Sequence, residues 1–283
     1  MRRTAAILIS AAVLSACGDA GSSSVGGALP DADHVHALRA SGDGTLLLGL
    51  HGALWRSPDE GVSWVKGGLD GQDAMSIGVA VAGEPLLVGG HNVLERSLDD
   101  GATFAPLRPS TLPGLDIHAL TQAPSDPNIT YAFVVGAGLF RSGDAGDTWE
   151  QRAPVGDLLP PDIAAAIVMP ADPDVVLVGS GSTGIYRSED GGATFELVSD
   201  WGTLGLAVSE AGDDLIATTY RGVDRSVDGG GRIWENLADP EQFEGQPIAT
   251  TIDDDGTIWV ITEQPRVLWR SDDGRSWQEV ARA

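Results

Sequence analysis

The chain of 283 residues contains very little cysteine and lysine, and each shortage excludes something. Its one cysteine, Cys17, has no second cysteine to pair with, so an intrachain disulfide is excluded. Lys66 is its one lysine, and 17 basic residues stand against 41 acidic ones, giving a net charge of −24. A surface this acidic repels nucleic acid and anionic lipid, so we expect no nucleic-acid partner.

The apolar stretch at the N-terminus is too short to be a mature membrane span. Arg2 and Arg3 precede it, it covers residues 5–14, and small residues follow it. This order predicts an export signal. The ending Leu-Ser-Ala-Cys, at Cys17, resembles the bacterial lipobox, whose cysteine is acylated and becomes the mature N-terminus. The alternative is an ordinary secretory signal with an incidental cysteine.

These features divide the chain into three parts. We expect a lipoprotein signal peptide over residues 1–17, a flexible Gly- and Ser-rich tether over residues 18–30, and one globular domain over residues 31–283. The lipobox resemblance implies an exported protein that is lipid-anchored to the cell membrane at Cys17, on the extracellular face or in the periplasm. The membrane would then be a partner through this anchor.

A short phrase recurs six times in the globular part: Arg-Ser, a loop rich in Asp and Gly, and then an aromatic residue. The first copy runs from Arg56 to Trp64, the fifth carries one extra residue and the sixth lacks one. The aspartates that we assign to the key position are 38 to 46 residues apart, at Asp59, Asp99, Asp144, Asp190, Asp228 and Asp272. A period of this size is typical of radial arrays of small sheets.

Each repeat contains four short apolar runs separated by turn residues, which is the pattern of a four-stranded antiparallel unit. In the first repeat we expect strands at residues 34–38, 45–50, 53–56 and 63–66. Six such units over residues 31–283 predict an all-β fold, a six-bladed β-propeller of four-stranded antiparallel blades. The last blade must then pack against the first.

The repeated phrase, Ser-x-Asp-x-Gly-x-Thr-Trp, closely resembles the Asp-box, or bacterial neuraminidase repeat, in four copies and partly in two. Asp and Ser side chains accept hydrogen bonds from their own turn, glycine supplies a positive φ, and the aromatic ring can be buried between blades. The resemblance implies that the box joins the third and fourth strands, on the face away from the ligand site. We interpret all six copies as structural, because the ligand spacing of a calcium-binding EF-hand is absent.

The five histidines map to one sector of the face opposite the boxes. His34 and His36 open the first strand of the first blade and point to the same side. His118 is the counterpart of His36 in the third blade, with Asp116 in the place of His34. His51 and His91 lie six residues before a box serine, in turns between second and third strands.

Three interpretations of these histidines remain open. Neutral imidazoles beside carboxylates such as Asp33 and Asp116 suit zinc or copper(II), the cofactors that we expect if there is one. Metal–nitrogen bonds of ~2.1 Å would then bring at least three imidazoles within roughly 5 Å of one another. Alternatively, the histidines are polar side chains bonded to channel backbone or water, or one acts as a general acid or base in a hydrolytic site.

Sialidases resemble this chain in fold, but their catalytic pattern is missing. They need an arginine triad, a Tyr–Glu pair and an Arg-Ile-Pro motif, and no Arg-Ile-Pro occurs here. The turn argument places Tyr220, Arg221 and Arg266 on the ligand face. Trp201, on the same face, is either a packed rim residue or a ring that stacks on a sugar. These residues are too few for a carboxylate clamp, so we do not expect sialidase activity.

Three segments, His-Val-His-Ala-Leu, Gly-Leu-His-Gly-Ala-Leu-Trp-Arg-Ser and Asp-Ile-His-Ala-Leu, are similar to an exported bacterial group of Asp-box propellers often labelled glycosyl hydrolase. That label rests on fold kinship, and a fold does not determine chemistry. We therefore favour binding of a metal ion, small ligand or partner protein over catalysis. The alternatives are a glycosyl hydrolase acting on cell-surface glycans and an assembly scaffold for an envelope complex.

Overall fold

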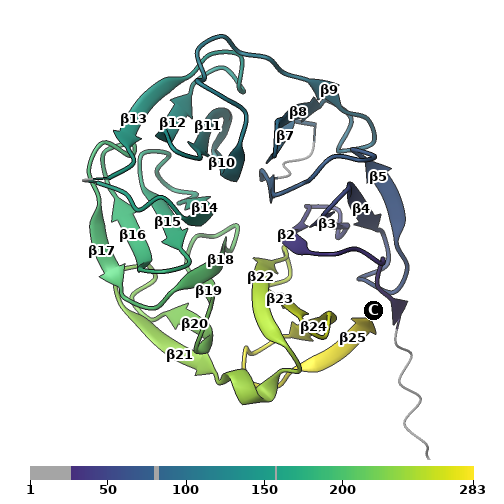
Figure 1. Cartoon of the computed structure of the whole chain (residues 1–283). Helices are drawn as coiled ribbons and strands as arrows, with labels where there is room; N and C mark the ends of the chain where they lie inside the picture. Colours follow the sequence, from purple (N-terminus) through teal and green to yellow (C-terminus); the bar gives the residue numbers. More distant parts are fainter. Residues whose placement is uncertain (1–26, 80–82, 157) are drawn as a thin grey trace, which may run out of the picture.

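The computed structural model describes residues 27–79, 83–156 and 158–283. Six antiparallel sheets are arranged as a ring, which confirms the predicted six-bladed β-propeller (Figure 1). Helix in these residues is limited to the 3-10 turn η1 (Pro240–Gln242), and none of their helices has the length and apolar character needed to cross a membrane. The export signal and Cys17 lie outside the described residues.

Each blade uses four consecutive strands, numbered from the innermost outward. Blade 1 contains β2 (Val35–Ala40), β3 (Leu46–Leu50), β4 (Ala53–Ser57) and β5 (Val65–Gly68). Blade 2 contains β6 (Ser76–Ile77), β7 (Leu86–Gly90), β8 (Val93–Ser97) and β9 (Ala105–Pro106). Blade 3 contains β10 (Ile117–Ala123), β11 (Asp126–Val134), β12 (Gly138–Ser142) and β13 (Glu150–Pro154).

The second half of the ring repeats this order. Blade 4 contains β14 (Ile163–Val168), β15 (Val176–Ser180), β16 (Gly184–Ser188) and β17 (Glu196–Ser199). Blade 5 contains β18 (Thr203–Val208), β19 (Leu215–Thr219), β20 (Gly222–Ser226) and β21 (Trp234–Ala238). Blade 6 contains β22 (Gln246–Ile252), β23 (Ile258–Glu263), β24 (Val267–Ser271) and β25 (Gln278–Arg282).

The second strands are near-continuous apolar runs because a neighbouring blade covers each of their faces. All five residues of β3 are buried, as are all five of β7, β15 and β19. The core is accordingly divided into six apolar clusters, one at each junction between blades. The ring is thus held by nearest-neighbour packing.

An additional strand closes the ring. β1 (Gly27–Ala28) pairs in parallel with β25, so the sheet of blade 6 has five strands. The amide of Leu29 continues this pairing by donating to the carbonyl of Arg282 over 3.0 Å, and its side chain is buried between blades 6 and 1. The flexible tether that we expected over residues 18–30 is therefore wrong for residues 27–30, which are docked on blade 6.

The repeated phrases form the turns between the third and fourth strands, as predicted, and we call these the repeat turns. In the first, the hydroxyl of Ser57 donates to Asp59 over 2.9 Å and accepts the amide of Gly61 over 2.8 Å. The two Asp59 oxygens also accept the amide and the hydroxyl of Ser63. These hydrogen bonds are internal to the turn, which gives the aspartate a structural role there.

The sixth repeat turn corrects one assignment, because Asp273 and not Asp272 holds it. Asp273 accepts the hydroxyl of Ser271 over 3.1 Å and the amide of Ser276 over 2.7 Å. Asp272 lies 3.5 Å from the guanidinium of Arg270 instead. This copy lacks a residue between its aspartate and its glycine, so counting from the serine gives Asp273, whereas counting back from the glycine gives Asp272.

Candidate functional site

The five histidines lie at one end of the ring, which we call the histidine face. It carries the starts of the inner strands and the turns between second and third strands, whereas the repeat turns define the opposite, repeat-turn face. The histidines occupy the start of β2 (His34 and His36), the turn from β3 to β4 (His51), the turn from β7 to β8 (His91) and β10 (His118).

Three of the histidines meet a carboxylate from another blade or from the connection that leads to it. The pairs, with their Nδ1-to-carboxylate distances, are His34 with Glu263 at 3.5 Å, His51 with Asp73 at 3.0 Å, and His91 with Asp116 at 2.7 Å. They lie at three successive junctions, between blades 6 and 1, blades 1 and 2, and blades 2 and 3.

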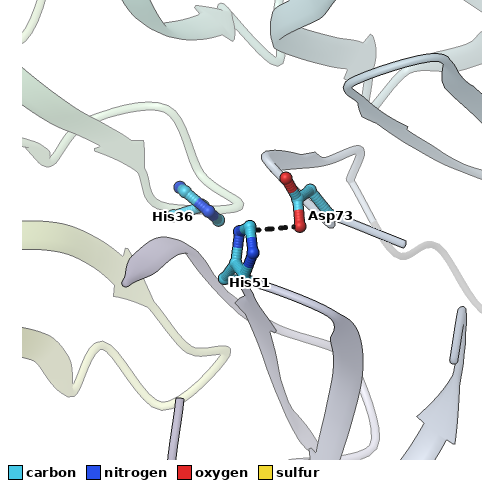
Figure 2. A group of neighbouring side chains, drawn as sticks. All are labelled: His36, His51 and Asp73. Carbon is cyan, nitrogen blue, oxygen red and sulfur yellow. Dashed lines mark ion pairs between the residues drawn. The ribbon is translucent and has the colours of Figure 1, made fainter. Parts of the chain in front are cut away.

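A first cluster consists of His36, His51 and Asp73 (Figure 2). One ligand atom from each residue lies within 4.8 Å of the other two. Asp73 comes from the connection between β5 and β6, and its Oδ1 accepts the amide of Gly52 over 3.0 Å. This bond fixes the carboxylate beside His51, whose side chain remains 52% exposed.

His36 is partly buried, and it is the histidine of this cluster that is more shielded from solvent. Its Nε2 is buried and has no hydrogen-bond partner among the described residues. Burial lowers the pKa of His36 to about 4, the neighbouring His34 and His51 act in the same direction, and Asp73 and Glu263 oppose them. His36 is therefore neutral at pH 7, which is the form in which an imidazole binds a metal.

A second cluster consists of His91, Asp116 and His118. Asp116 Oδ1 is hydrogen-bonded to Nδ1 of His91 at 2.7 Å, and Nε2 of His118 lies 3.3 Å from the same oxygen without hydrogen-bonding geometry. Burial lowers the pKa of His118, with a smaller contribution from His91. Asp116 is thus already hydrogen-bonded to an imidazole, whereas Asp73 forms only an ion pair with His51, so this cluster is less open to a ligand than the first. The Nε2 of His118 is, like that of His36, buried without a partner among the described residues.

The expected convergence of three imidazoles was wrong. Within 4.8 Å, the part of the chain that the structure describes brings together two imidazoles at a time, each pair with an aspartate. His34 is outside both clusters, although its ring centroid is 6.5 Å from that of His36, as is the centroid of His51. The site is thus a pair of two-histidine, one-aspartate clusters.

Sequence reasoning found Asp116 but missed Asp73 and Glu263. Asp73 and Asp116 share a sequence position, which was the available signal: each lies just before the inner strand of the next blade. From there each side chain reaches back to the preceding blade, at the turn between its second and third strands. Glu263 ends β23, where its Oε1 accepts the amide of Val35 over 3.0 Å.

The other candidates on this face separate into two groups. Trp201 and Tyr220 are exposed, and the guanidinium of Arg221 lies 5.1 Å above the Trp201 ring while its Nε donates to the buried Asp224. Arg266 is buried and donates to the carbonyls of Pro30 and Ala32. Arg266 therefore holds the incoming chain and is not free to bind a ligand, which corrects its assignment.

No protein-family model and no curated protein matches the sequence. Solved structures resemble it in fold. The GH74 enzyme of Niastella koreensis has a TM-score of 0.66 at 17% identity, over 89% of this chain and 46% of the enzyme. A chain of a nidogen–laminin complex has a TM-score of 0.66 at 12% identity, over 84% of this chain and 94% of that one. YCF48 from Cyanidioschyzon merolae has a TM-score of 0.56 at 14% identity, over 89% of this chain and 86% of YCF48.

This chain spans less than half the length of that GH74 enzyme and of a second, ancestral GH74 enzyme, of which it covers 38%. The neighbours include glycoside hydrolases as well as YCF48 and a nidogen–laminin chain, and their identities of 12 to 18% establish the propeller fold alone.

Proposed function

We propose that the protein binds a transition-metal ion, zinc or copper(II), through His36, His51 and Asp73. The observation that supports this most is the convergence of His36, His51 and Asp73, of which one ligand atom each lies within 4.8 Å of the other two. In addition, the Nε2 of His36 is buried and lacks a hydrogen-bond partner among the described residues. A buried polar atom without a partner is costly, and a metal ion would satisfy it. Two imidazoles and one carboxylate suit both metals and leave one coordination position open.

The cluster needs only a small rearrangement to hold an ion. With metal bonds of ~2.1 Å, ligand atoms around a tetrahedral ion are about 3.4 Å apart, somewhat less than the 4.8 Å limit of this cluster. His51 is half exposed and sits in a turn, so its ring can rotate, while Asp73 is held by the Gly52 amide. The same face supplies a weaker second site at His91, Asp116 and His118.

Titration of the purified protein with zinc and with copper(II) by calorimetry tests this proposal. We expect His36→Ala or His51→Ala to weaken the stronger site at least about tenfold, since loss of a residue that only hydrogen-bonds to a metal ligand already weakens metal sites by that factor. His34→Ala is the matched control, because His34 is on the same strand end but outside the cluster. Equal affinity in His36→Ala and His34→Ala would overturn the proposal and favour a scaffold role, such as that suggested by a YCF48 structure with a bound D1 peptide.

The exported state and the lipid anchor are part of this proposal. The sequence before residue 27 resembles a lipoprotein signal, and the repeat turns resemble Asp-boxes in sequence and in their Ser–Asp hydrogen bonds. Expression with and without Cys17→Ala, followed by membrane fractionation, tests the anchor. Cys17→Ala should move the protein from the membrane fraction to the soluble fraction, and an unchanged distribution would contradict acylation at Cys17.

A glycan-directed role is the second candidate. It is favoured by Trp201 and Tyr220, which are 44% and 56% exposed on the histidine face, where aromatic rings can stack on sugars. The GH74 neighbours are consistent with it only at the level of fold. Assays with a panel of aryl glycosides and soluble polysaccharides, compared between the wild type and Trp201→Ala, test it. If the wild type shows no turnover and no binding of these substrates, this role is ruled out.

A further inference from the structure

The axis of the ring contains two cavities that meet at one side chain. A cavity of about 40 Å³ lies toward the histidine face, between the starts of the inner strands, and includes His36 in its wall. A cavity of about 370 Å³ lies toward the repeat-turn face, where the inner strands end. Among the described lining residues, Arg39 alone borders both cavities.

Arg39 has little to stabilise its charge. Its Nη2 donates to the carbonyl of Ile77 over 3.3 Å, while its Nε is buried with no partner in the described residues. Burial lowers the pKa of Arg39 to about 10, and no described carboxylate offsets this effect. The guanidinium is therefore still charged at pH 7, and a partly buried cation without an anion costs free energy.

At the repeat-turn face, the end of the larger cavity carries negative charge, opposite to that of Arg39. Glu210 and Asp254 line it, in turns between first and second strands of blades 5 and 6. The pKa of Asp254 is raised first by burial and then by the nearby carboxylates of Glu210, Asp253, Asp255 and Asp43. Between this acidic end and Arg39 the wall is mixed: it has an apolar part at Ile167, Val208 and Ile252, and hydroxyl groups from Thr121, Ser209 and Thr251.

We propose that this cavity binds a small zwitterion whose carboxylate contacts Arg39 and whose ammonium group lies at Glu210 and Asp254. A carboxylate supplies the missing counter-charge to the guanidinium, which is the side chain best suited to bind it in two-point fashion. A methylene chain fits the apolar part of the wall between the two charged ends. A dianion is disfavoured by the acidic end, and a simple cation is disfavoured by Arg39.

Calorimetric titrations of the wild-type protein with four six-carbon probes separate the contribution of the carboxylate from that of the ammonium group. The probes are 6-aminohexanoate, hexanoate, hexylamine and adipate. We expect 6-aminohexanoate to bind most tightly and adipate most weakly. Arg39→Gln should weaken 6-aminohexanoate by about 10- to 100-fold, the usual effect of losing a charge-assisted hydrogen bond. It should not weaken hexylamine and should strengthen it, because the positive charge that disfavours a simple cation is removed. Glu210→Gln should act on the ammonium end instead: it should reduce the advantage of 6-aminohexanoate over hexanoate.

Arg275→Gln is the control, because it removes one positive charge from an exposed position on the repeat-turn face. It should leave all four affinities unchanged. Removing an unpaired, partly buried cation should not lower the melting temperature, so Arg39→Gln should melt at or above the wild-type Tm. Absence of binding by every probe, equal binding of adipate and 6-aminohexanoate, or unchanged 6-aminohexanoate affinity in Arg39→Gln would each overturn the proposal. A lower Tm with unchanged affinity would assign Arg39 to blade packing alone.

Discussion

At the scale of single residues, the carboxylates of the repeat turns titrate far below their usual range. The pKa values of Asp99, Asp190 and Asp273 fall to about 2, because each carboxylate accepts hydrogen bonds from the hydroxyl or the amide of the Ser or Thr at the end of its turn, and from others within it. A lowered folded-state pKa means that the unfolded chain binds protons more readily than the folded one.

This shift predicts the acid stability of the propeller. The contribution of these three aspartates is fully present above pH about 4, near the pKa of 3.8 of an unperturbed Asp, and is lost as the pH falls toward 2. We therefore expect the loss of Tm with acidification, followed by circular dichroism, to extend down to pH about 2. A collapse that is complete by pH 4 would contradict this account.

The correction in the sixth repeat turn gives a matched pair of variants. Asp273→Ala removes the acceptor for Ser271 and Ser276, so it should lower the Tm by a few degrees. Asp272→Ala removes a long ion pair with Arg270 and a 3.4 Å hydrogen bond from the hydroxyl of Thr257, so it should lower the Tm less than Asp273→Ala does. Thermal melts of the two variants decide between the assignments, and the opposite order would restore Asp272 to the key position.

The histidine clusters show how far residue types alone can predict a site. Spacing from the repeat serine places His51 and His91 in equivalent turns, because the repeat fixes where each turn begins. The partners were harder to predict. Asp73 lies, like Asp116, just before the inner strand of the next blade, but that strand, β6, has only two residues, so little in the sequence marks where it begins. Forty-one acidic residues give many equivalent choices, and only the packing of neighbouring blades selects one.

At the scale of elements, each repeat turn packs against the preceding blade, and the first does so at ring closure. Gly61 has φ +84°, and a Cβ added there would lie 2.3 Å from Cδ2 of Leu268 in blade 6. Gly256, in the turn between β22 and β23, has the same φ of +84° but nothing within 4 Å of an added Cβ. The two glycines therefore separate backbone strain from packing.

Alanine at each glycine should have unequal effects. Gly256→Ala should cost about 1–2 kcal/mol, the penalty of a left-handed conformation for a residue with a side chain. Gly61→Ala should cost about 1–3 kcal/mol more, because the extra methyl overpacks the junction with Leu268. Urea unfolding of both variants measures the difference. Equal free energies of unfolding would mean that the junction between blades 6 and 1 accommodates the extra methyl group without an energetic penalty.

The strands themselves were largely predictable from the sequence, but the way in which the ring closes was not. The first blade was expected at residues 34–38, 45–50, 53–56 and 63–66, and its strands lie within two residues of these bounds. The turn residues and apolar runs are local signals, so they identify strands directly. β1 has two residues of Gly and Ala, and its pairing with β25 depends on a partner about 250 residues away, which no local pattern encodes.

At the scale of the whole molecule, stability arises from six equivalent junctions and is opposed by one overall charge. Each apolar cluster joins two neighbouring blades, and the cluster between blades 6 and 1 includes Leu29 from the closing segment. Ion pairs add links across the same junctions, such as Arg96 with Asp147 and Arg270 with Glu60. These pairs are exposed, so each adds little.

The net charge of −24 predicts how the ring responds to salt. Repulsion among the acidic side chains is strongest in the compact state, and the distance over which charges act shrinks from about 30 Å at 0.01 M salt to about 8 Å at 0.15 M. The Tm should therefore rise by a few degrees over this range of sodium chloride. Choline chloride should have the same effect, because screening depends on ionic strength and not on the cation. A falling Tm would mean that the surface ion pairs outweigh the repulsion, and a rise with sodium alone would indicate a specific cation site.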